Sequence, residues 1–255
     1  MNRSLDQRLT HSERLGRAFD PSVEFWRRYY EGAVDEREPR PTERLAVFRE
    51  ALSSVDASGL WLDAGCGIGE MARRFRETGL RVCGIDMSSA LLEEARQLTG
   101  LPLVAAGDVP AGDEHLTRAS VERTPYRDEQ FDGVYSSSVL EYVADLEVAL
   151  RELHRVVRRD GHLVFNMPNA FSIFRMTHAL VRLPLSVLGR SWYYRLVPRW
   201  AYWKWDLTTI LRRSGWEPLR FTYYECFPEW VPARTRARLA VQPWASSFIL
   251  IVARK

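Results

Sequence analysis

The chain has 255 residues, of which 46% are hydrophobic, enough for one α/β domain with a sizeable core. A net charge of +3 is too small to indicate nucleic-acid binding by itself, and no apolar run approaches the ~18 residues of a membrane span. The three cysteines have neither metal-site spacing nor that of a disulfide framework, so we expect no metal. Residues 1–20 are polar and lack the apolar stretch of a signal peptide, so we expect a cytoplasmic protein.

The first forty residues are charged and irregular, with one stretch of helical periodicity. Four aromatic residues fall at helical spacing there: Phe25, Trp26, Tyr29 and Tyr30. We therefore expect residues 1–40 to form a helical and irregular cap segment ahead of a domain that spans 41–255. Thr42 is a candidate N-cap for a helix that runs to about residue 55.

Strands and helices alternate along the rest of the chain. Besides a third strand, we expect strands at 60–63, 80–85, 131–135, 162–166, 216–224 and 248–253. Helices are expected at 68–78, at 88–98 after an N-cap at Ser88, from an N-cap at Asp145 to Gly161, and from an N-cap at Asp206 to Gly215. This alternation predicts a doubly wound α/β sheet that is largely parallel.

Two stretches compete for the third strand. One is 103–106, which ends in Gly107 and Asp108, and the other is 117–121. The second stretch keeps the usual distance to the strand at 131–135. We therefore favour it, which makes 101–116 an insertion.

The most informative motif follows the first predicted strand. That strand ends on Asp63, and Gly65, Gly67 and Gly69 then stand at alternate positions before a helix begins. This order brings a ligand against bare backbone near the positive end of a helix. The next strand ends on Asp86, about 20 residues on, where a ribose-binding acid belongs in a βαβ nucleotide unit. The Gly-x-Gly-x-Gly spacing and the preceding acid favour a ligand with an ammonium group over a dinucleotide pyrophosphate.

Four motifs follow one another along the chain, at residues 62–69 (LDAGCGIG), 84–88 (GIDMS), 124–134 (TPYRDEQFDGV) and 153–163 (LHRVVRRDGHL). In these motifs and their order the chain resembles the class I S-adenosylmethionine-dependent methyltransferases over roughly residues 41–169. The likeness is to small-molecule enzymes of the ubiquinone and menaquinone type. It implies a Rossmann-like seven-stranded sheet with an antiparallel last strand, S-adenosylmethionine as cofactor and a small-molecule methyl acceptor.

The resemblance also implies a set of cofactor contacts. Asp63 would hold the α-amino group, and Asp86 would accept both ribose hydroxyls, because a carboxylate fits two adjacent O–H donors. Met87 would pack against the adenine face. The predicted cofactor-binding residues are Asp63, Gly65, Cys66, Gly67, Gly69, Asp86, Met87, Ser120, Val121 and Ser136.

The adenine edge departs from the family pattern. Relatives often carry an Asp there that binds the exocyclic amine, whereas Ser120 takes that position in this chain. A serine hydroxyl accepts the same hydrogen bond more weakly. Asp108 is the alternative contact if the third strand is 103–106.

The methyl acceptor is expected at the carboxyl end of the sheet, where ligands bind in doubly wound folds. Glu141 and Tyr142 follow the strand at 131–135, and they either face the acceptor or cap and pack the next helix. The candidate catalytic bases or acceptor contacts are Glu141, His178, Tyr29 and Tyr30.

Residues 170–205 are the most unusual in composition, with no Asp or Glu, six basic residues and nine aromatic residues. This composition favours a helical lid over an apolar or anionic acceptor. Two other interpretations stay open: an interfacial helix that contacts anionic lipid, and an ordinary helical hairpin or dimer contact. The aromatic residues are bunched with Leu and Val, which indicates burial, so we expect no nucleic-acid partner.

The sequence thus predicts methyl transfer from S-adenosylmethionine to a small molecule by in-line displacement, in which the protein positions and desolvates the reactants. One alternative is a cofactor-binding protein on the same fold that transfers no methyl group, and Ser120 mildly supports it. A second is a peripheral membrane methyltransferase that acts on a lipid or an isoprenoid.

Overall fold

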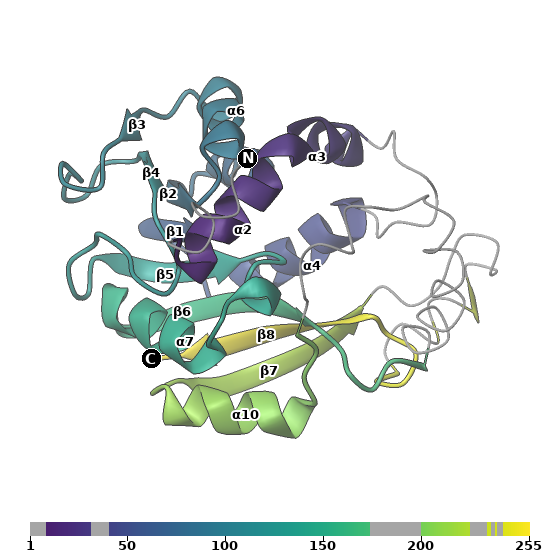
Figure 1. Ribbon diagram of the computed structural model, residues 1–255. Helices are drawn as coiled ribbons and strands as arrows, with labels where there is room; N and C mark the ends of the chain where they lie inside the picture. The colour runs from purple at the N-terminus through teal and green to yellow at the C-terminus, as the bar shows by residue number, and fades with distance from the viewer. Residues whose placement is uncertain (1–8, 32–40, 174–199, 225–233, 236–237, 239–241) are drawn as a thin grey trace.

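The computed structural model describes residues 9–31, 41–173, 200–224, 234–235, 238 and 242–255. Within this part, one sheet has the strand order β3-β4-β2-β1-β5-β6-β8-β7 (Figure 1). Strand β8 is antiparallel to β6 and β7, and the other neighbours are parallel. The predicted doubly wound sheet with an antiparallel last strand is confirmed. The strands are β1 Leu60–Ala64, β2 Arg81–Asp86, β3 Leu103–Val104, β4 Leu116–Arg118, β5 Phe131–Ser136, β6 Val157–Pro168, β7 Glu217–Tyr224 and β8 Phe248–Arg254.

Helices cover both faces of the sheet (Figure 1). On one face, Phe48 of α4 and Phe75 of α5 pack into a cluster with Trp61 and other side chains of the sheet. On the other face, α7 and α10 bury Leu150 and Leu211 in the largest cluster of the described residues. Strands buried on both faces need nearly continuous apolar runs, which β1 and β8 have. The helices are α4 Pro41–Ser54, α5 Glu70–Arg76, α6 Ser89–Thr99, α7 Leu146–Val156 and α10 Lys204–Arg213.

Both candidates for the third strand form strands, which explains why the sheet has eight strands and not the expected seven. β4 pairs with β2 and so takes the third position, within the region that we favoured, but it ends at Arg118. The chain then turns, because Ser120 accepts a backbone hydrogen bond from Arg123. The stretch at 103–106 contributes the two-residue edge strand β3, which pairs with β4.

Two predicted N-caps are confirmed. The Ser88 hydroxyl accepts a hydrogen bond from Leu91 N, and the Asp145 carboxylate accepts from Glu147 N and Val148 N. Side-chain oxygens at these positions satisfy amides that have no partner within the helix.

The predicted boundaries of three helices are wrong, two at the first residue and one at the last. α4 begins at Pro41 and not after Thr42, since proline favours the first helical position. α10 begins at Lys204, because the chain leaves a β-bridge at Tyr202 and turns directly into the helix, so Asp206 lies in the first turn. α7 ends at Val156 and not at Gly161, because the next residue is a β-branched valine that pairs with β5.

The N-terminal segment forms helices that sequence periodicity predicted only in part. Helix α3 (Val23–Tyr30) covers the expected aromatic stretch, and it is preceded by α2 (His11–Phe19) and the short 3-10 helix η1 (Asp20–Ser22). Contacts of this segment reach three loops of the sheet. His11 bonds to the carbonyl of Tyr142, Ser12 to the side chain of Ser120, and Asp20 accepts from Ser88.

None of the helices in the described ranges is both long enough and apolar enough to cross a membrane.

Candidate functional site

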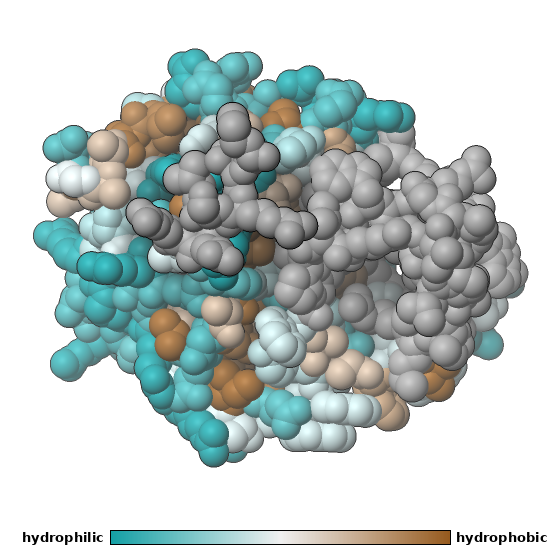
Figure 2. All heavy atoms as spheres, viewed as in Figure 1, coloured by the Kyte–Doolittle hydropathy of each residue, from teal (hydrophilic) through white to brown (hydrophobic). Residues whose placement is uncertain are grey.

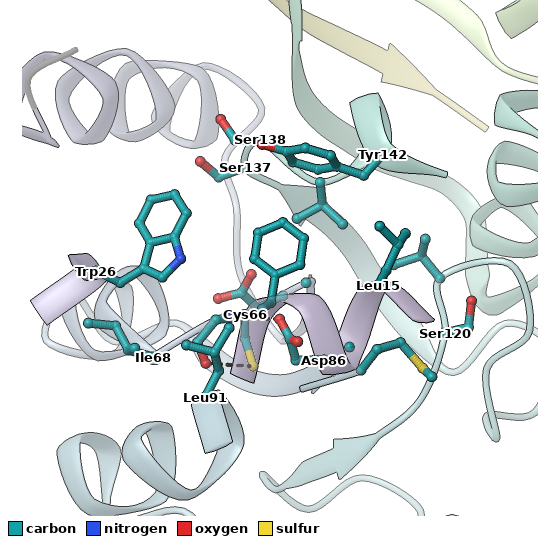
Figure 3. A pocket seen from close by; sticks show the side chains of 18 of the residues that line it. Leu15, Trp26, Cys66, Ile68, Asp86, Leu91, Ser120, Ser137, Ser138 and Tyr142 are labelled. Carbon is teal, nitrogen blue, oxygen red and sulfur yellow. Dashed lines mark hydrogen bonds between the residues drawn. The ribbon is translucent and has the colours of Figure 1, made fainter. Parts of the chain in front are cut away.

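A pocket lies between the carboxyl ends of β1, β2 and β5 and the N-terminal helices α2 and α3 (Figure 3). Its volume is about 970 Å³ with the open mouth included, within the range typical of ligand sites. In Figure 3, Trp26 and Ser120 lie at opposite ends of the pocket and Asp86 lies between them. Eight of the ten predicted cofactor-binding residues line it: Asp63, Gly65, Cys66, Gly67, Asp86, Met87, Ser120 and Val121.

The glycine loop forms the floor of the pocket. Gly65 has a φ of +86°, and a Cβ atom there would come within 2.2 Å of the Val139 side chain. Gly67 has a φ of +54°, and its amide donates to Asp86 Oδ2 at 3.0 Å. Only glycine adopts both conformations without strain and leaves the backbone open to a ligand. Gly69 lies outside the lining, where it precedes α5 in a left-handed turn.

Asp86 ends β2 and is fixed by backbone amides on both carboxylate oxygens. Gly67 N donates to Oδ2 at 3.0 Å and Ser88 N donates to Oδ1 at 2.8 Å. Burial raises the pKa of the Asp86 carboxyl, and these amide hydrogen bonds oppose the shift. Each oxygen keeps a further lone pair for a ligand donor.

Asp63 is a second carboxyl group on the same pocket, and it is more deeply buried than Asp86. It is 2% exposed at the end of β1. Burial raises its pKa to about 8, a nearby hydroxyl of Tyr135 opposes the shift, and the charge of Asp86 adds to it. Burial makes both carboxyl groups harder to ionise. A cationic ligand in this pocket would stabilise their charged forms and would be attracted by both.

Arg44 is a pocket residue that the sequence analysis missed. It is 5% exposed on α4, and its guanidinium lies 5.5 Å from the centre of the Tyr29 ring. Burial raises the pKa of the Tyr30 hydroxyl to about 12, while Arg44 lowers it and Asp63 raises it. Arg44 and Asp63 therefore share one end of the pocket. The sequence does contain a signal for this position. Arg44 stands one helical turn before Phe48, so it shares the apolar face of the helix that packs on the sheet.

The opposite end of the pocket carries a small polar network. The hydroxyls of Ser12 and Ser120 lie 3.0 Å apart, and Ser12 Oγ donates to Glu122 Oε2 at 2.8 Å. Glu122 N in turn donates to Ser120 Oγ at 3.2 Å. Ser12 and Glu122 both line the pocket and were not predicted, whereas the rival contact Asp108 lies in the loop after β3, outside the lining.

The predicted catalytic residues are not gathered on the pocket wall. Tyr30 lines the pocket, whereas Tyr29 is buried and packs edge-on against Tyr30 with ring centres 5.2 Å apart. Glu141 is fully buried in the 3-10 helix η2 (Leu140–Tyr142) and is not part of the lining, although its neighbour Tyr142 is. His178 lies outside the described residues. The roles of all four stay predictions.

The loop after β5 supplies polar groups to the wall. Ser136, predicted as a cofactor contact, is buried outside the lining, and its hydroxyl donates to the Ala64 carbonyl at 2.8 Å. The next two residues do line the pocket. Ser137 Oγ is buried and has no hydrogen-bond partner among the described residues, and Ser138 has a φ of +56°. An orphaned buried hydroxyl is expected to bond to a ligand, because its desolvation is otherwise uncompensated.

Within the ranges that the structure covers, no group of three His, Cys, Asp or Glu residues could hold a metal ion. Burial also raises the pKa of the Cys66 thiol, which therefore stays protonated at neutral pH.

Comparison with known proteins places this pocket in a family. Residues 62–165 match the family model described as a methyltransferase domain, and this range contains the glycine loop and Asp86. This match, together with the relatives and solved structures below, supports a class I S-adenosylmethionine-dependent methyltransferase. The match ends within β6, so residues 170–205 lie outside it.

Curated relatives of this chain differ in the part that they cover. A malonyl-[acyl-carrier protein] O-methyltransferase from Serratia marcescens is 36% identical over 112 residues, which are 44% of this chain and 39% of the relative. The O-methyltransferase resE from Aspergillus sclerotiorum is 29% identical over 189 residues, 71% of this chain and 63% of the relative. The chain thus spans less than two thirds of the length of these curated relatives.

Solved structures share the fold of this chain. The magnesium protoporphyrin IX methyltransferase from Synechocystis PCC 6803 has a TM-score of 0.60 at 16% identity and covers 94% of this chain and 98% of its own. At that identity the likeness concerns the fold alone.

Proposed function

We propose that this protein transfers a methyl group from S-adenosylmethionine to an oxygen atom of a small-molecule acceptor that is apolar, aromatic or anionic. The observation that carries the proposal is the pair of carboxyl groups, the buried Asp63 and the half-buried Asp86, which face one pocket together with the buried Arg44. The names of the two curated relatives, both O-methyltransferases, support oxygen as the methylated atom.

The donor set fits S-adenosylmethionine from end to end. Asp63 would bind the α-ammonium group and Arg44 the α-carboxylate, since both lie at the same end of the pocket. Asp86, midway along, would accept the ribose hydroxyls. The network around Ser120 at the far end would accept from the adenine amine.

For this reaction the protein mainly has to position the two reactants and exclude water from the reacting atoms. When bound, S-adenosylmethionine supplies a methyl group on a sulfonium whose leaving group is already activated. The apolar side chains of Leu15, Phe19, Val139 and Tyr142 line the pocket and would keep water from the reacting atoms. A carboxylate acceptor needs no base at neutral pH, whereas a hydroxyl acceptor would need one. Tyr30, the predicted candidate that lines the pocket, has a pKa raised to about 12, so it would stay protonated and would donate a hydrogen bond to the acceptor rather than take its proton.

The acceptor would lie beside the loop after β5. The orphaned Ser137 hydroxyl could donate to an acceptor oxygen there. Residues 170–205 would close the acceptor side, as the sequence analysis expected, in a domain that spans 41–255 behind an N-terminal cap at 1–40. Support for this arrangement comes from Trp200 N, which donates to the carbonyl of Glu141 at 2.9 Å, next to the pocket residue Tyr142.

Calorimetric titration with S-adenosylhomocysteine tests the cofactor part of the proposal. Asp86→Ala removes two charge-assisted hydrogen bonds, each worth roughly 1.5–3 kcal/mol, so affinity should fall at least about tenfold. Asp108→Ala is the matched control, because this acid lies outside the pocket lining, and its affinity should equal that of the unmodified protein. Unchanged affinity in a folded Asp86→Ala variant would contradict the assignment.

A transfer assay tests the reaction itself. The protein is incubated with methyl-labelled S-adenosylmethionine and pools of carboxylic acids, phenols and amines, and labelled products are identified by mass spectrometry. Label on oxygen is the expected result. Label on nitrogen or carbon alone would overturn the choice of atom, and tight cofactor binding without transfer to any pool would favour the non-methylating alternative.

A further inference from the structure

Large apolar side chains are exposed together at one end of the molecule, over the N-terminal end of α10. The most exposed are Trp205 at 64%, Ile173 at 53% and Trp200 at 52%. Figure 2 shows pale and brown atoms gathered at the lower edge of this view, beside the residues drawn in grey. We call this set the aromatic platform, and its members are Phe171, Ile173, Trp200, Trp203, Trp205 and Trp244.

Hydrogen bonds join the three chain segments that form the aromatic platform. Ala170 N donates to the carbonyl of Tyr202 at 3.1 Å, and Ile173 N donates to that of Trp244 at 2.8 Å. The buried Asn169 side chain donates to the carbonyls of Pro243 and Ser246 at 2.6 and 2.8 Å. The platform is therefore a structured surface.

The rings of the platform also pack on one another. The Trp203 and Trp205 rings are stacked, with centres 5.0 Å apart and planes inclined by 4°, and Phe171 lies 5.5 Å from Trp203. Their outer faces nevertheless stay in water. Soluble monomers rarely expose apolar side chains in such a group unless a partner or a membrane covers them.

The residue types and the charge indicate which partner fits. Tryptophan is enriched where a protein meets the headgroup region of a bilayer, because its ring is apolar and its N–H is polar. The sequence between the platform residues Ile173 and Trp200 contains five arginines and no acid, and Lys204 adds a sixth basic residue next to Trp203 and Trp205. Such a stretch attracts anionic lipid headgroups and repels a second copy of itself.

We propose that the aromatic platform docks this protein on the surface of an anionic lipid bilayer. The platform adjoins the pocket, since Trp200 bonds to Glu141 and the next residue, Tyr142, lines the pocket wall. A docked protein would hold the acceptor side of its pocket close to the membrane, so an apolar acceptor could enter from the lipid. This last consequence rests on the proposed methyl transfer, whereas the docking itself does not.

Co-sedimentation with vesicles tests the docking. The full chain should bind vesicles of phosphatidylcholine and phosphatidylglycerol in equal parts, and should bind vesicles of pure phosphatidylcholine more weakly. The double variant Trp203→Ser, Trp205→Ser should lose at least about tenfold in affinity for the mixed vesicles, because two large apolar rings no longer enter the interface. Serine at position 203 precedes α10, where it is a favoured N-cap, so the helix should persist.

The matched control removes two apolar side chains that are exposed elsewhere. Leu98→Ser, Leu103→Ser changes residues on α6 and β3, far from the platform in strand order, and should bind vesicles like the unmodified protein. S-adenosylhomocysteine affinity, measured by calorimetry for every variant, should not change. A loss of vesicle binding with intact cofactor binding thus separates the docking from the proposed function.

Three outcomes would overturn the proposal. The first is that the unmodified protein fails to bind the anionic vesicles, and the second is that the platform variant binds them as tightly as the control does. The third is that sedimentation velocity without lipid shows a dimer that only the platform variant loses, which would assign the surface to a second copy of the chain.

Discussion

Asn166 and Ser138 stand 28 residues apart in the chain and bond to each other twice. Ser138 N donates to Asn166 Oδ1 at 2.6 Å, and Asn166 Nδ2 donates to Ser138 Oγ at 3.2 Å. Asn166, fully buried on β6, also donates to the Tyr224 hydroxyl at 2.8 Å. This buried amide therefore holds the strained loop that presents the Ser137 hydroxyl to the pocket.

Replacing that amide should disturb turnover more than cofactor binding. Asn166→Ala leaves Ser138 N without its acceptor, which should lower the free energy of unfolding by about 1–3 kcal/mol and lower kcat. Affinity for S-adenosylhomocysteine should change less than about threefold, because the glycine loop and Asp86 keep their contacts. Thermal unfolding, steady-state kinetics and calorimetry check the three effects. Equal losses in kcat and in cofactor affinity would show that the loop after β5 binds the cofactor and not the methyl acceptor.

Gly16 on α2 should be sensitive to even one added methyl group. A Cβ atom at this position would lie 2.4 Å from the Met87 carbonyl oxygen, on the wall of the pocket. Alanine normally stabilises a helix by about 1 kcal/mol relative to glycine. A loss of ligand affinity in Gly16→Ala would therefore come from the close contact with Met87 and not from helix propensity. We expect Gly16→Ala to displace α2 and weaken S-adenosylhomocysteine binding about tenfold or more. The exposed Arg17→Ala is the control, and higher affinity in Gly16→Ala would mean that α2 does not close the pocket.

Arg44→Met should remove the proposed partner of the cofactor carboxylate while it keeps much of the buried side-chain volume. Affinity for S-adenosylhomocysteine should fall about tenfold to a hundredfold, as expected for a charge-assisted pair. Methylthioadenosine lacks the amino acid part, so its affinity should stay the same in the variant. Calorimetry with both ligands separates the two cases, and parallel losses would indicate that Arg44 only supports the fold.

The raised pKa of Asp63 should show in the stability of the unliganded protein. The carboxyl has a pKa of about 8 in the folded state against an ordinary value of 3.8, so the folded state holds the proton more tightly over that interval. The contribution to stability is complete below about pH 4 and is lost as the pH rises through about 8. Asp63→Asn should therefore flatten the decline of the melting temperature between pH 5 and pH 8. The exposed Asp56→Asn serves as control and should follow the unmodified protein.

Local chemistry made much of the fold and of the pocket lining predictable. The order of strand, glycine loop and helix located the loop at Gly65 and Gly67, and the acid that ends the next strand located Asp86. Capping chemistry predicted the helix starts after Ser88 and Asp145. These features depend on residues that are close in the chain, so periodicity and spacing are sufficient to find them.

Residues that come together only through packing were missed. Arg44 reaches the pocket because α4 lies on the sheet, and Ser12 reaches Ser120 across 108 residues of chain. Helix α2 does have a local signal, the capping box of Thr10 and Glu13. Asp206 was misjudged because the β-bridge at Tyr202 sets the start of α10, and no local pattern encodes that bridge.

The contacts of α2 and η1 with three separate loops have a consequence for exchange with solvent. A ligand in the pocket would touch these N-terminal residues and the loops of the sheet at the same time. Ligand binding and packing of the N-terminal segment on the sheet are therefore linked, and each stabilises the other. Amide protons in residues 11–30 should therefore exchange with deuterium more slowly when S-adenosylhomocysteine is present, whereas those in β7, far from the pocket, should keep their rates. The residence time of the cofactor would then be set by how often this segment opens.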